Sequence, residues 1–494
     1  MKLMDLLEEI DTIEIKGEER INIENIYYDS RKVTPNSLFI CIEGFQTDGH
    51  HFIDQAIKKG AIAIVAQKDM TGLDGVTWVQ VKDTRQVMAQ LGSTFYGRPS
   101  QHLELIGVTG TNGKTSTTYM IKKILENHER KVGLIGTIAN WIGNTEVEAQ
   151  RTTPESIDLQ QIFKEMADEK VTECVMEVSS HALALERVAE SEFKVGVFTN
   201  LTPEHLDFHE NIDNYREAKK KLFYLTTVAN VINIDDPHGA MIAEEVKKLK
   251  PSLITFGIKK QATVMAKNIA TTLKDVTFDL VTPVGEARVT VKIPGIFSAY
   301  NALASIATSI AIGVPFDVIV QGIQSIPGVP GRFESVLGIK DFSVIVDYAH
   351  TPDAIENVIQ AAKNVTEHRV ITVFGCGGDR DRTKRSVMGE ISGSLSDLSV
   401  ITSDNPRTED PYKILMMIEA GIKKTKGLYT IIEDRREAIR YAMKEAKKGD
   451  IVLIAGKGHE ATQQIGSNVI IFDDCGVARE IAKEEGLDDS DIHS

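Results

Sequence analysis

A glycine-rich stretch that ends in lysine and threonine is the part of this sequence best suited to chemistry. It runs from Gly107 to Ser116, at the end of an apolar run of strand length (103–108) and before apolar residues at helical spacing over 120–125. A strand-to-helix turn directs free backbone N–H groups and the positive end of the helix dipole at one point, which favours a bound phosphate. The pattern therefore predicts a nucleotide-binding loop, in which the Lys114 ammonium reaches the terminal phosphates and the Thr115 hydroxyl ligates Mg²⁺.

One position departs from the strict P-loop pattern, because Val108 stands where that pattern has its first glycine, five residues before Gly113. The alternative interpretation is a Gly- and Ser-rich turn that binds no ligand. The strand before the loop, the Gly-Lys-Thr sequence and the helix after it together favour phosphate binding.

Glu177 ends an apolar strand and is a candidate metal ligand. A carboxylate at a strand end near a phosphate loop suits Mg²⁺, which prefers hard oxygen donors. A solvated glutamate is the alternative, and the apolar neighbours of Glu177 disfavour it. His205 and His209 have the i, i+4 spacing of a helical zinc pair, but no third ligand has a convincing spacing, so structural or hydrogen-bonding histidines are expected.

Polar clusters follow predicted strands in the last third of the chain, at 347–350, 377–380, 404–407 and 456–460. Because ligands of doubly wound sheets bind at the carboxyl ends of strands, these clusters predict a binding site. Arg380 and Arg407 would suit bidentate carboxylate binding if they converge, although each taken singly is better explained as a surface arginine. A dinucleotide fingerprint is rejected, because Arg380 occupies the place of its last glycine.

A basic run, Lys219 to Lys221, lies on a predicted helix. Such a run is usually a solvated helix face. Neither residue type nor spacing singles out one of these lysines.

The elements that must position these groups fall into three units. Residues 1–98 are predicted to form a small α/β domain, with strands at 38–42 and 61–65 and a helix around 52–58. Residues 99–330 are predicted to form a P-loop-type domain with a mainly parallel sheet and helices on both faces. Its strands are expected at 103–108, 132–138, 174–178, 195–199 and 230–234, followed by an antiparallel extension over 263–293 and a helix over 295–312.

A linker at 327–331 leads to the third unit, residues 331–494, which repeats the strand–helix rhythm. We predict a doubly wound, Rossmann-like domain here. Its strands are expected at 344–347, 370–374, 398–403, 430–432 and 451–455.

Bulk composition excludes several classes of protein. The 494 residues carry a formal net charge of −15, which disfavours binding to nucleic acid or to an anionic membrane surface. No segment reaches the length of a membrane span, and the N-terminus lacks the basic start and long apolar run of a signal peptide. The four cysteines are scattered without a Cys-x-x-Cys pair, which predicts reduced thiols and a cytoplasmic location.

Together, these motifs resemble those of the Mur ligases, the ATP-dependent enzymes that build the peptidoglycan stem peptide. The resemblance covers nearly all of the chain, and the family's ATP loop, similar to 110–115, accounts for Val108. The other motifs that carry the resemblance, in family order, are Glu177–His181, Thr199–Leu201, His205–Asp207, Tyr300–Ala302, Gly331–Glu334 and Asp347–Pro352.

Within the family, the chain resembles the members that add the third residue of the stem peptide, with meso-diaminopimelate as that residue. The departures from the family pattern are mild: Ser116 replaces a common Thr, Arg151 a common Asn, and 202–204 a common Ser-Arg-Asp. The segments that carry this closer resemblance are Asp29–Arg31, Arg151–Pro154, Gly378–Arg380, Asp404–Arg407 and Gly456–Glu460.

The resemblance implies catalytic and metal-binding roles for a few residues. Lys114 and Thr115 would hold ATP and Mg²⁺, and Glu177 and His205 would help to bind the metal. Lys219 would carry CO₂ as a carbamate, an anion that binds Mg²⁺. The residues implied to contact ATP are Gly110, Thr111, Asn112, Gly113, Lys114, Thr115 and Ser116, with Asn301, Arg332 and Asp347 across the domain junction.

The resemblance also assigns residues to the other two substrates. The uridine nucleotide would contact Ser30, Phe45, Gln46 and Thr47, and the muramoyl-peptide would contact Thr152, Thr153, Ser179 and Arg187. Diaminopimelate would contact Arg380, Asp404, Asn405, Pro406, Arg407, Gly456 and Glu460.

The reaction implied is amide-bond formation. The glutamate carboxylate of UDP-MurNAc-L-Ala-D-Glu attacks the γ-phosphate of ATP, and the amine of meso-diaminopimelate attacks the resulting acyl phosphate. Three alternatives are open: the same ligase with L-lysine, a folylpolyglutamate synthetase-like ligase, and a nucleotide-regulated binding protein without catalysis. Arg407 disfavours L-lysine, which lacks a second carboxylate for it to hold. The N-terminal domain with Asp-Ser-Arg disfavours the folylpolyglutamate alternative, in which it would be unexplained. The non-catalytic alternative is disfavoured by the intact set of Lys114, Glu177, His205 and Lys219. A monomer that binds small molecules is expected.

Overall fold

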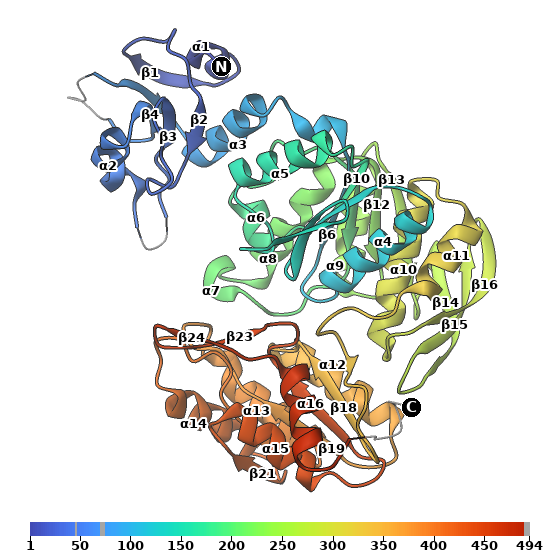
Figure 1. The fold of residues 1–494 in the computed structure, drawn as a ribbon. Coiled ribbons are helices and arrows are strands. Elements are labelled where there is room, and N and C mark those ends of the chain that lie inside the picture. The colour runs from blue at the N-terminus through green and yellow to red at the C-terminus, as the bar shows by residue number, and fades with distance from the viewer. Residues whose placement is uncertain (45–46, 70–74, 489–494) are drawn as a thin grey trace.

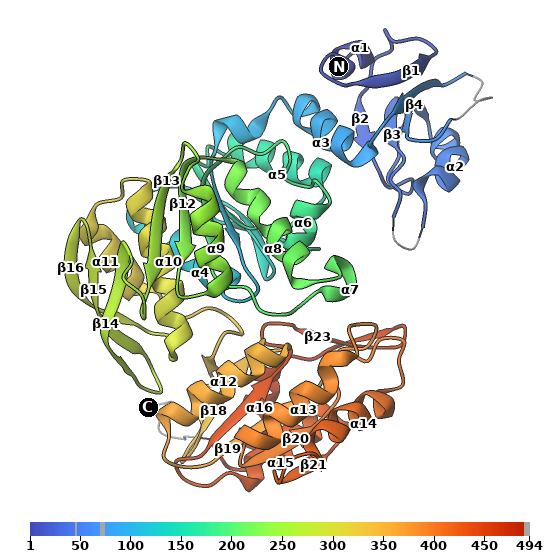
Figure 2. The same ribbon diagram turned by 180° about the vertical axis from the view of Figure 1, so that it is seen from behind.

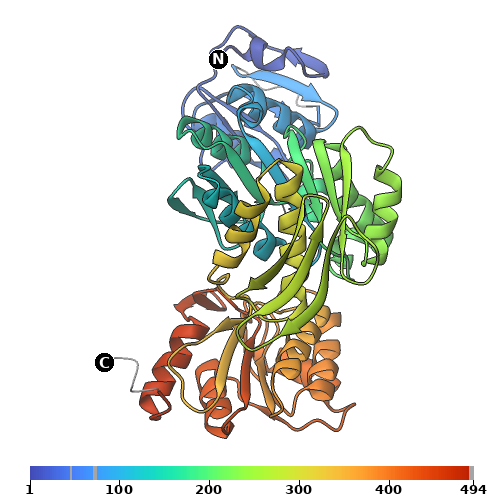
Figure 3. The same cartoon turned by 90° about the vertical axis from the view of Figure 1, so that its right-hand side faces the viewer.

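The structure is a computed structural model that describes residues 1–44, 47–69 and 75–488 of the chain. It is an α/β protein with three domains, each built around its own sheet (Figure 1). Figure 3 shows the domains stacked in a column, with the N-terminal domain at one end and the C-terminal domain at the other. Among the described helices, none is long and apolar enough to cross a membrane. The boundaries after residues 98 and 330 remain predictions.

The N-terminal sheet has five strands in the order β1-β5-β4-β3-β2. The strands expected at 38–42 and 61–65 are β3 and β4, and the helix expected between them is α2. β3 is shorter than expected because Ile42 O accepts a hydrogen bond from Gly49 N (2.9 Å), which closes a loop instead of extending the sheet. The elements are α1 (Leu3–Leu7), β1 (Thr12–Lys16), β2 (Asn25–Tyr27), β3 (Ser37–Ile40), α2 (Ile53–Lys58), β4 (Ala61–Ala66), β5 (Thr77–Val81) and α3 (Thr84–Phe95).

The central sheet has eleven strands in the order β16-β15-β14-β13-β12-β11-β6-β10-β7-β8-β9. Its strands are β6 (Glu104–Thr109), β7 (Val132–Ile135), β8 (Ala139–Ile142), β9 (Thr145–Glu148), β10 (Glu173–Glu177), β11 (Phe193–Phe198), β12 (Thr226–Asn233), β13 (Ser252–Gly257), β14 (Val264–Thr271), β15 (Val276–Thr282) and β16 (Gly285–Val291). Its helices are α4 (Lys114–Asn127), α5 (Ser156–Asp168), α6 (Ser180–Ala184), α7 (Leu206–His209), α8 (Ile212–Lys220), α9 (Pro237–Val246), α10 (Ile296–Ala311) and α11 (Phe316–Ser325).

Both faces of this sheet are buried, as the apolar pattern of its first strand predicts. Leu105 of β6 packs in one cluster with Phe163 of α5, whereas Ile106 and Val108 pack in another with Ile121 of α4. Because side chains alternate along a strand, β6 contributes to both cores. The expected antiparallel extension is also confirmed, since β15 pairs antiparallel with both β14 and β16.

Several strand ends differ from the prediction. The strand expected at 132–138 ends at Ile135, because the chain then turns to bring Thr137 N within 2.8 Å of a Glu177 carboxylate oxygen. The strands expected at 174–178, 195–199 and 230–234 each begin earlier and end one residue earlier. Val178 N and Thr199 N still donate to neighbouring strands (2.8 and 3.0 Å), so those two boundaries differ only at the frayed end of the ladder.

The C-terminal sheet has six strands in the order β17-β18-β22-β19-β20-β21, with only β17 antiparallel to its neighbour. Helices cover both of its faces, with α12 and α13 on the side seen in Figure 2, and this confirms the doubly wound prediction. The strands expected at 398–403 and 430–432 are 398–401 and 429–431. The elements are β17 (Glu334–Ser335), β18 (Ser343–Asp347), α12 (Pro352–Val365), β19 (Val370–Phe374), α13 (Thr383–Leu395), β20 (Leu398–Ile401), α14 (Pro411–Ile422), β21 (Tyr429–Ile431), α15 (Arg435–Glu445), β22 (Ile451–Ala455), β23 (Thr462–Ile465), β24 (Asn468–Ile471) and α16 (Asp474–Glu484).

Gly331, at the end of the predicted linker, packs directly on the loop that follows β22. Its φ is +64°, and a Cβ atom there would lie 2.1 Å from His459 N. Only glycine fits this position, because both the dihedral angle and the close backbone approach exclude a side chain.

Candidate active site

The predicted phosphate loop lies between β6 and α4, as expected, and two of its glycines are required by geometry. Gly110 and Gly113 have φ of +147° and +86°. An added Cβ would lie 1.9 Å from Thr199 Oγ1 at Gly110 and 2.4 Å from Asn301 Oδ1 at Gly113. The loop therefore packs too closely on its neighbours for any larger residue at either position.

Lys114 begins α4 and folds back over this loop. Its ammonium donates to Gly110 O (3.0 Å) and Thr111 O (2.8 Å). Burial lowers its pKa, and the nearby charge of Glu177 opposes that shift. A lysine held over the loop in this way lies where a phosphate cradled by the loop would meet it.

Thr115 and Glu177 bring hard oxygen donors together beside the loop. Thr115 Oγ1 donates to Glu177 Oε1 (3.0 Å), and the Glu177 side chain also accepts from Thr137 N and Thr137 Oγ1 (2.8 and 3.1 Å). Within the described residues, no group of three or more His, Cys, Asp or Glu side chains could hold a metal. Mg²⁺ needs no such group, because it commonly binds one or two carboxylates together with phosphate oxygens and water, so this pair fits Mg²⁺.

The structure separates Lys219 from the two lysines that follow it. Lys219 is only 1% exposed, and its ammonium donates to Gly110 O (2.8 Å) and lies 4.5 Å from the centre of the Tyr215 ring. Burial and the neighbouring Lys114 lower its pKa far below the usual value. Lys220 and Lys221 instead form surface ion pairs with Glu245 and with Glu186.

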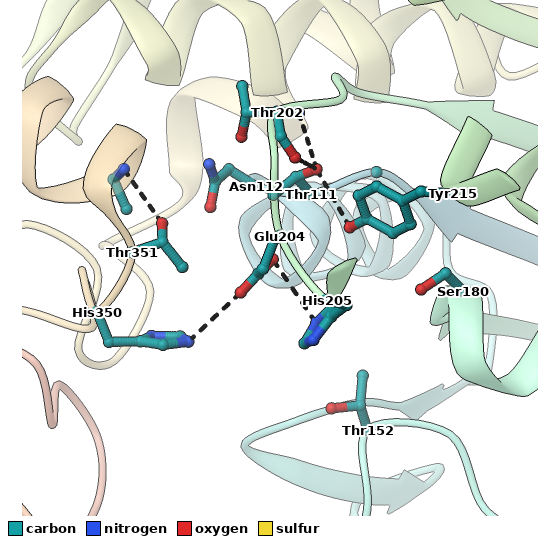
Figure 4. A network of polar contacts seen from close by, with 12 residues as sticks. Thr111, Asn112, Thr152, Ser180, Thr202, Glu204, His205, Tyr215, His350 and Thr351 are labelled. Carbon is teal, nitrogen blue, oxygen red and sulfur yellow. Dashed lines mark hydrogen bonds and ion pairs between the residues drawn. The ribbon is translucent and has the colours of Figure 1, made fainter. Parts of the chain in front are cut away.

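His205 and His209 lie in different surroundings, although α7 gives them the helical spacing expected. His209 Nε2 is within hydrogen-bond distance of Ser180 Oγ (2.9 Å), which confirms a hydrogen-bonding histidine. His205 precedes α7 with φ of +57°, and its Nε2 lies 3.7 Å from a Glu204 carboxylate oxygen. That carboxylate also lies 3.9 Å from His350 Nε2 of the C-terminal domain, so Glu204 joins histidines of two domains (Figure 4). No zinc cluster is present among the residues that the structure describes.

Residues of the central and C-terminal domains line one cavity next to the phosphate loop. Arg332 donates to Thr115 Oγ1 (2.9 Å), and Asn112 Nδ2 donates to Asp353 Oδ2 (2.7 Å), so side chains bridge the two domains. Asp347 accepts from Phe333 N and Ala349 N at 2.7 and 2.8 Å, and burial raises its pKa. The predicted nucleotide residues that line this cavity are Asn112, Gly113, Thr115, Ser116, Asn301, Arg332 and Asp347.

Comparison with known proteins agrees with this arrangement in all three domains. Three family models match the chain: "Mur ligase family, catalytic domain" over 22–96, "Mur ligase middle domain" over 108–309, and "Mur ligase, glutamate ligase domain" over 331–458. A relative from Alkaliphilus oremlandii, a UDP-N-acetylmuramoyl-L-alanyl-D-glutamate–2,6-diaminopimelate ligase, is 56% identical over 99% of this chain and 100% of its own length.

The chain belongs to the Mur ligase family.

Two further relatives of this Mur ligase carry the same name. The protein from Clostridioides difficile is 50% identical over 97% of this chain and 99% of its own length. A solved structure of such a ligase is 30% identical, with a TM-score of 0.70, and the match covers 98% of this chain and 99% of that one. The match therefore extends over the whole three-domain fold.

A second cavity of this Mur ligase lies between its N-terminal and central domains. Ser30 and Thr47 line it together with three arginines, so two of the residues implied to contact the uridine nucleotide lie near three cations: Arg31, Arg85 and Arg151. Ser30 is buried and donates to Gln55 Oε1 (2.9 Å). The other two residues of that prediction, Phe45 and Gln46, lie outside the described residues.

The residues implied to hold the muramoyl-peptide lie together around the carboxyl end of β10. Thr153 Oγ1 donates to Glu177 O (2.8 Å) and accepts from Ser179 N (3.1 Å), and Arg187 donates to Thr153 O (3.1 Å). Thr152 Oγ1 lies 3.0 Å from Thr137 Oγ1. This cluster thus adjoins the oxygen donors of Glu177.

The cluster implied to hold diaminopimelate lines a third cavity of this Mur ligase. Arg380 and Arg407 both reach it, and neither forms an ion pair with a carboxylate among the described residues. Burial and the neighbouring Arg407 lower the pKa of Arg380. The two arginines thus converge on one cavity, which is the arrangement that bidentate carboxylate binding requires. The predicted residues that line this cavity are Arg380, Asp404, Asn405, Arg407, Gly456 and Glu460, whereas Pro406 is absent from the lining and contributes backbone that packs against Gly378.

Sequence reasoning missed three polar residues of the site. Glu204 and His350 line the third cavity with His205, and Thr137 fixes both oxygens of Glu177. His350 lies in a strand-end cluster that the sequence did mark, but without a role. Glu204 has one signal in the sequence, its departure from the common Ser-Arg-Asp, whereas the apolar run around Thr137 predicts the interior of a strand.

Proposed function

We propose that this chain is the ATP-dependent ligase that joins meso-diaminopimelate to the D-glutamate of UDP-MurNAc-L-Ala-D-Glu in peptidoglycan precursor synthesis. The observation that carries the proposal is the third cavity, in which two arginines that pair with no carboxylate among the described residues lie with Glu204 and His205. Thr202, which also lines this cavity, is hydrogen-bonded to Thr111 of the phosphate loop. The curated relatives at 56% and 50% identity, whose names specify 2,6-diaminopimelate, support the same substrate. We further propose that it acts as a cytoplasmic monomer, in support of cell-wall growth and division.

The nucleotide side of the reaction falls to Lys114, Thr115 and Glu177. Two anions must approach when the substrate carboxylate attacks the γ-phosphate, and the Lys114 ammonium neutralises charge as it develops. Thr115 and Glu177 would hold Mg²⁺, which supplies further positive charge at the phosphates. Arg332 and Asn301 lie on the same cavity and would orient the nucleotide across the domain junction.

Lys219 would act as a carbamate. Only an uncharged amine reacts with CO₂, and burial beside Lys114 favours the uncharged form of Lys219. The product would be an anion close to His205, and together these two groups would bind a metal ion. The low pKa and the burial of Lys219 support this role, which neither Lys220 nor Lys221 can fill at the surface.

Attack by the amine takes place at the third cavity. Arg407, supported by Arg380, would hold the distal carboxylate of diaminopimelate, while Asn405 and Glu460 frame the amino group beside it. The Asn405 amide donates to Glu460 Oε2 (2.8 Å), so these two side chains act as one unit. Contacts between the domains at Arg332 and Asn112 would exclude water from the acyl phosphate.

A ligation assay tests this proposal directly. The protein is incubated with ATP, Mg²⁺, the UDP-dipeptide and either meso-diaminopimelate or L-lysine, and ADP and the UDP-tripeptide are measured. We expect tripeptide with diaminopimelate and little with lysine, because lysine leaves Arg407 unpaired. Equal efficiency with lysine would overturn the specificity, and ADP release with folate substrates instead would favour the folylpolyglutamate alternative.

A further inference from the structure

A hairpin outside the main C-terminal sheet packs against the loop that carries Asn405 and Arg407. It consists of β23 and β24, which pair antiparallel from Thr462 to Ile471, and it lies along the side of the domain that faces the central domain (Figure 1). The described lining of the amino-acid cavity includes no residue of this hairpin. The hairpin can therefore affect a bound amino acid only indirectly, through the loop at 404–407 and through Lys457, which donates to Thr462 O and to Glu460 Oε2 (3.2 Å).

The hairpin holds the backbone of Arg407 from both sides. Arg407 N donates to Gln464 O (3.1 Å), and Gly466 N donates to Arg407 O (2.7 Å). Arg407 has φ of +51°, a left-handed conformation that is uncommon for a residue with a side chain. Such a conformation persists where its surroundings over-determine it, and here these two hydrogen bonds do so. They set the direction in which the guanidinium leaves the loop.

The side chain of Gln463 adds a buried bond to the start of the same loop. Gln463 is 5% exposed, and its Nε2 donates to Asp404 O at 2.7 Å. The next residue donates its backbone N to Asn405 Oδ1 (2.8 Å), which leaves the Asn405 amide nitrogen free to donate to Glu460. Gln463 thus supports the loop from the side away from the cavity, whereas Asn405, Arg407 and Glu460 line the cavity itself.

We propose that Gln463 is a positioning residue for amino-acid selection: by holding Asp404 O, it keeps Asn405 and Arg407 aimed at the amino acid without touching it. The inference rests on the proposed function, since the amino acid in question is diaminopimelate. Gln463 should therefore affect the KM for the amino acid and its selectivity, but neither nucleotide binding nor the chemistry at Lys114.

The test uses a matched pair of substitutions on one strand of the full-length protein. Gln463→Glu replaces the donor by an oxygen that faces Asp404 O, whereas Gln464→Glu makes the same change where the side chain reaches only Gly466 O (3.4 Å). Gln463→Met keeps the length and packing of the side chain but lacks the donor, and it serves if the first variant does not fold. Thermal unfolding of each variant is recorded beside steady-state kinetics for ATP, the UDP-dipeptide, diaminopimelate and lysine.

We expect Gln463→Glu and Gln463→Met to raise the KM for diaminopimelate by about 10- to 100-fold, the effect of losing one buried hydrogen-bond partner, and to narrow the preference over lysine. The KM for ATP should stay within about twofold. Gln464→Glu should match the wild type, because both hydrogen bonds that residue 464 makes to the loop at 404–407 come from its backbone. Unchanged amino-acid kinetics in both Gln463 variants, or a loss that is equal for all substrates and follows the melting temperature, would overturn the inference. The wild type distinguishes the two hypotheses. If it ligates no diaminopimelate, both the proposed function and the role of Gln463 are wrong; if it is active, the variants test the role of Gln463 alone.

Discussion

The two loops that face each other across the domain junction, 110–116 and 404–407, are held in place in different ways. The nucleotide loop is fixed mainly by the strand end next to it: Asn112 N donates to Asn200 Oδ1 (2.9 Å), and Thr199 Oγ1 donates to Asn112 O (2.6 Å). The amino-acid loop is fixed by a hairpin that lies outside the main sheet of its domain, through the Gln463 side chain and the Gln464 backbone. The nucleotide loop is thus held by a strand of its own sheet, whereas the shape of the amino-acid loop depends on a hairpin outside the sheet.

This difference has a chemical counterpart. Phosphate is bound by backbone N–H groups and one lysine, which any chain can supply from a short stretch. Selection between diaminopimelate and lysine needs a guanidinium held in one direction, and that requires support from several strand ends. The substitutions below test whether the two loops can be impaired separately.

The largest effect is expected at the nucleotide loop. Lys114→Ala should abolish ADP release and ligation, because its ammonium is the cation proposed to neutralise the phosphates, whereas Lys219, which also reaches Gly110 O, is proposed to carry a carbamate. Lys122→Ala, which removes an ammonium that pairs with Glu126 on the same helix, is the control and should stay active. Turnover close to the wild-type rate in Lys114→Ala would show that the loop does not bind the reacting phosphate.

Replacement of Lys219 tests whether an anion is needed beside that loop. Lys219→Ala should lose activity, and a small carboxylic acid in the buffer should restore part of it, since a carboxylate can replace a carbamate. Lys219→Arg keeps a positive charge and should stay inactive, whereas Lys220→Arg at the surface should behave like the wild type. Full activity of Lys219→Arg contradicts the carbamate.

At the amino-acid loop the effect should be large but selective. Arg407→Ala leaves a carboxylate unpaired in a closed site, a loss of about 2–5 kcal/mol, so kcat/KM for meso-diaminopimelate should fall by roughly 30- to several-thousand-fold. The KM for ATP should hardly change, and Arg382→Ala, which removes an exposed guanidinium paired with Glu409, is the control. An Arg407→Ala enzyme that retains full selectivity over lysine would place the specificity elsewhere.

The smallest effect is expected where the two loops meet. Asn112→Ala removes the hydrogen bond to Asp353 of the C-terminal domain and should raise the KM for ATP by about 2- to 10-fold. Asp353→Ala should act to a similar extent, and the double variant should cost no more than either single one, because both remove the same contact. Additive effects in the double variant would mean that the two side chains act independently.

The sequence predicted the position of most main strands and a set of polar residues in the lining of each of the three cavities. It predicted the nucleotide loop best, because the strand, the loop and the helix are adjacent in the chain. It could not choose among Lys219, Lys220 and Lys221 on physical grounds, because their difference is burial against Tyr215, a tertiary property. The same limit explains Thr137, whose turn toward Glu177 interrupts an apolar run that predicts a longer strand.

The contact between Gly331 and His459 should couple nucleotide binding to amino-acid binding. Gly331 directly precedes Arg332, which reaches Thr115, and it packs without side chains on the loop that carries Glu460. Tyr348 N also donates to Gly331 O (2.9 Å). The segment that carries Arg332 and the loop that carries Glu460 are therefore expected to move together as one rigid unit. A rotation that draws Arg332 toward the nucleotide must carry the amino-acid pocket with it. We therefore expect the two sites to report on each other's occupancy, with the nucleotide-bound enzyme binding the amino acid more tightly than the free enzyme.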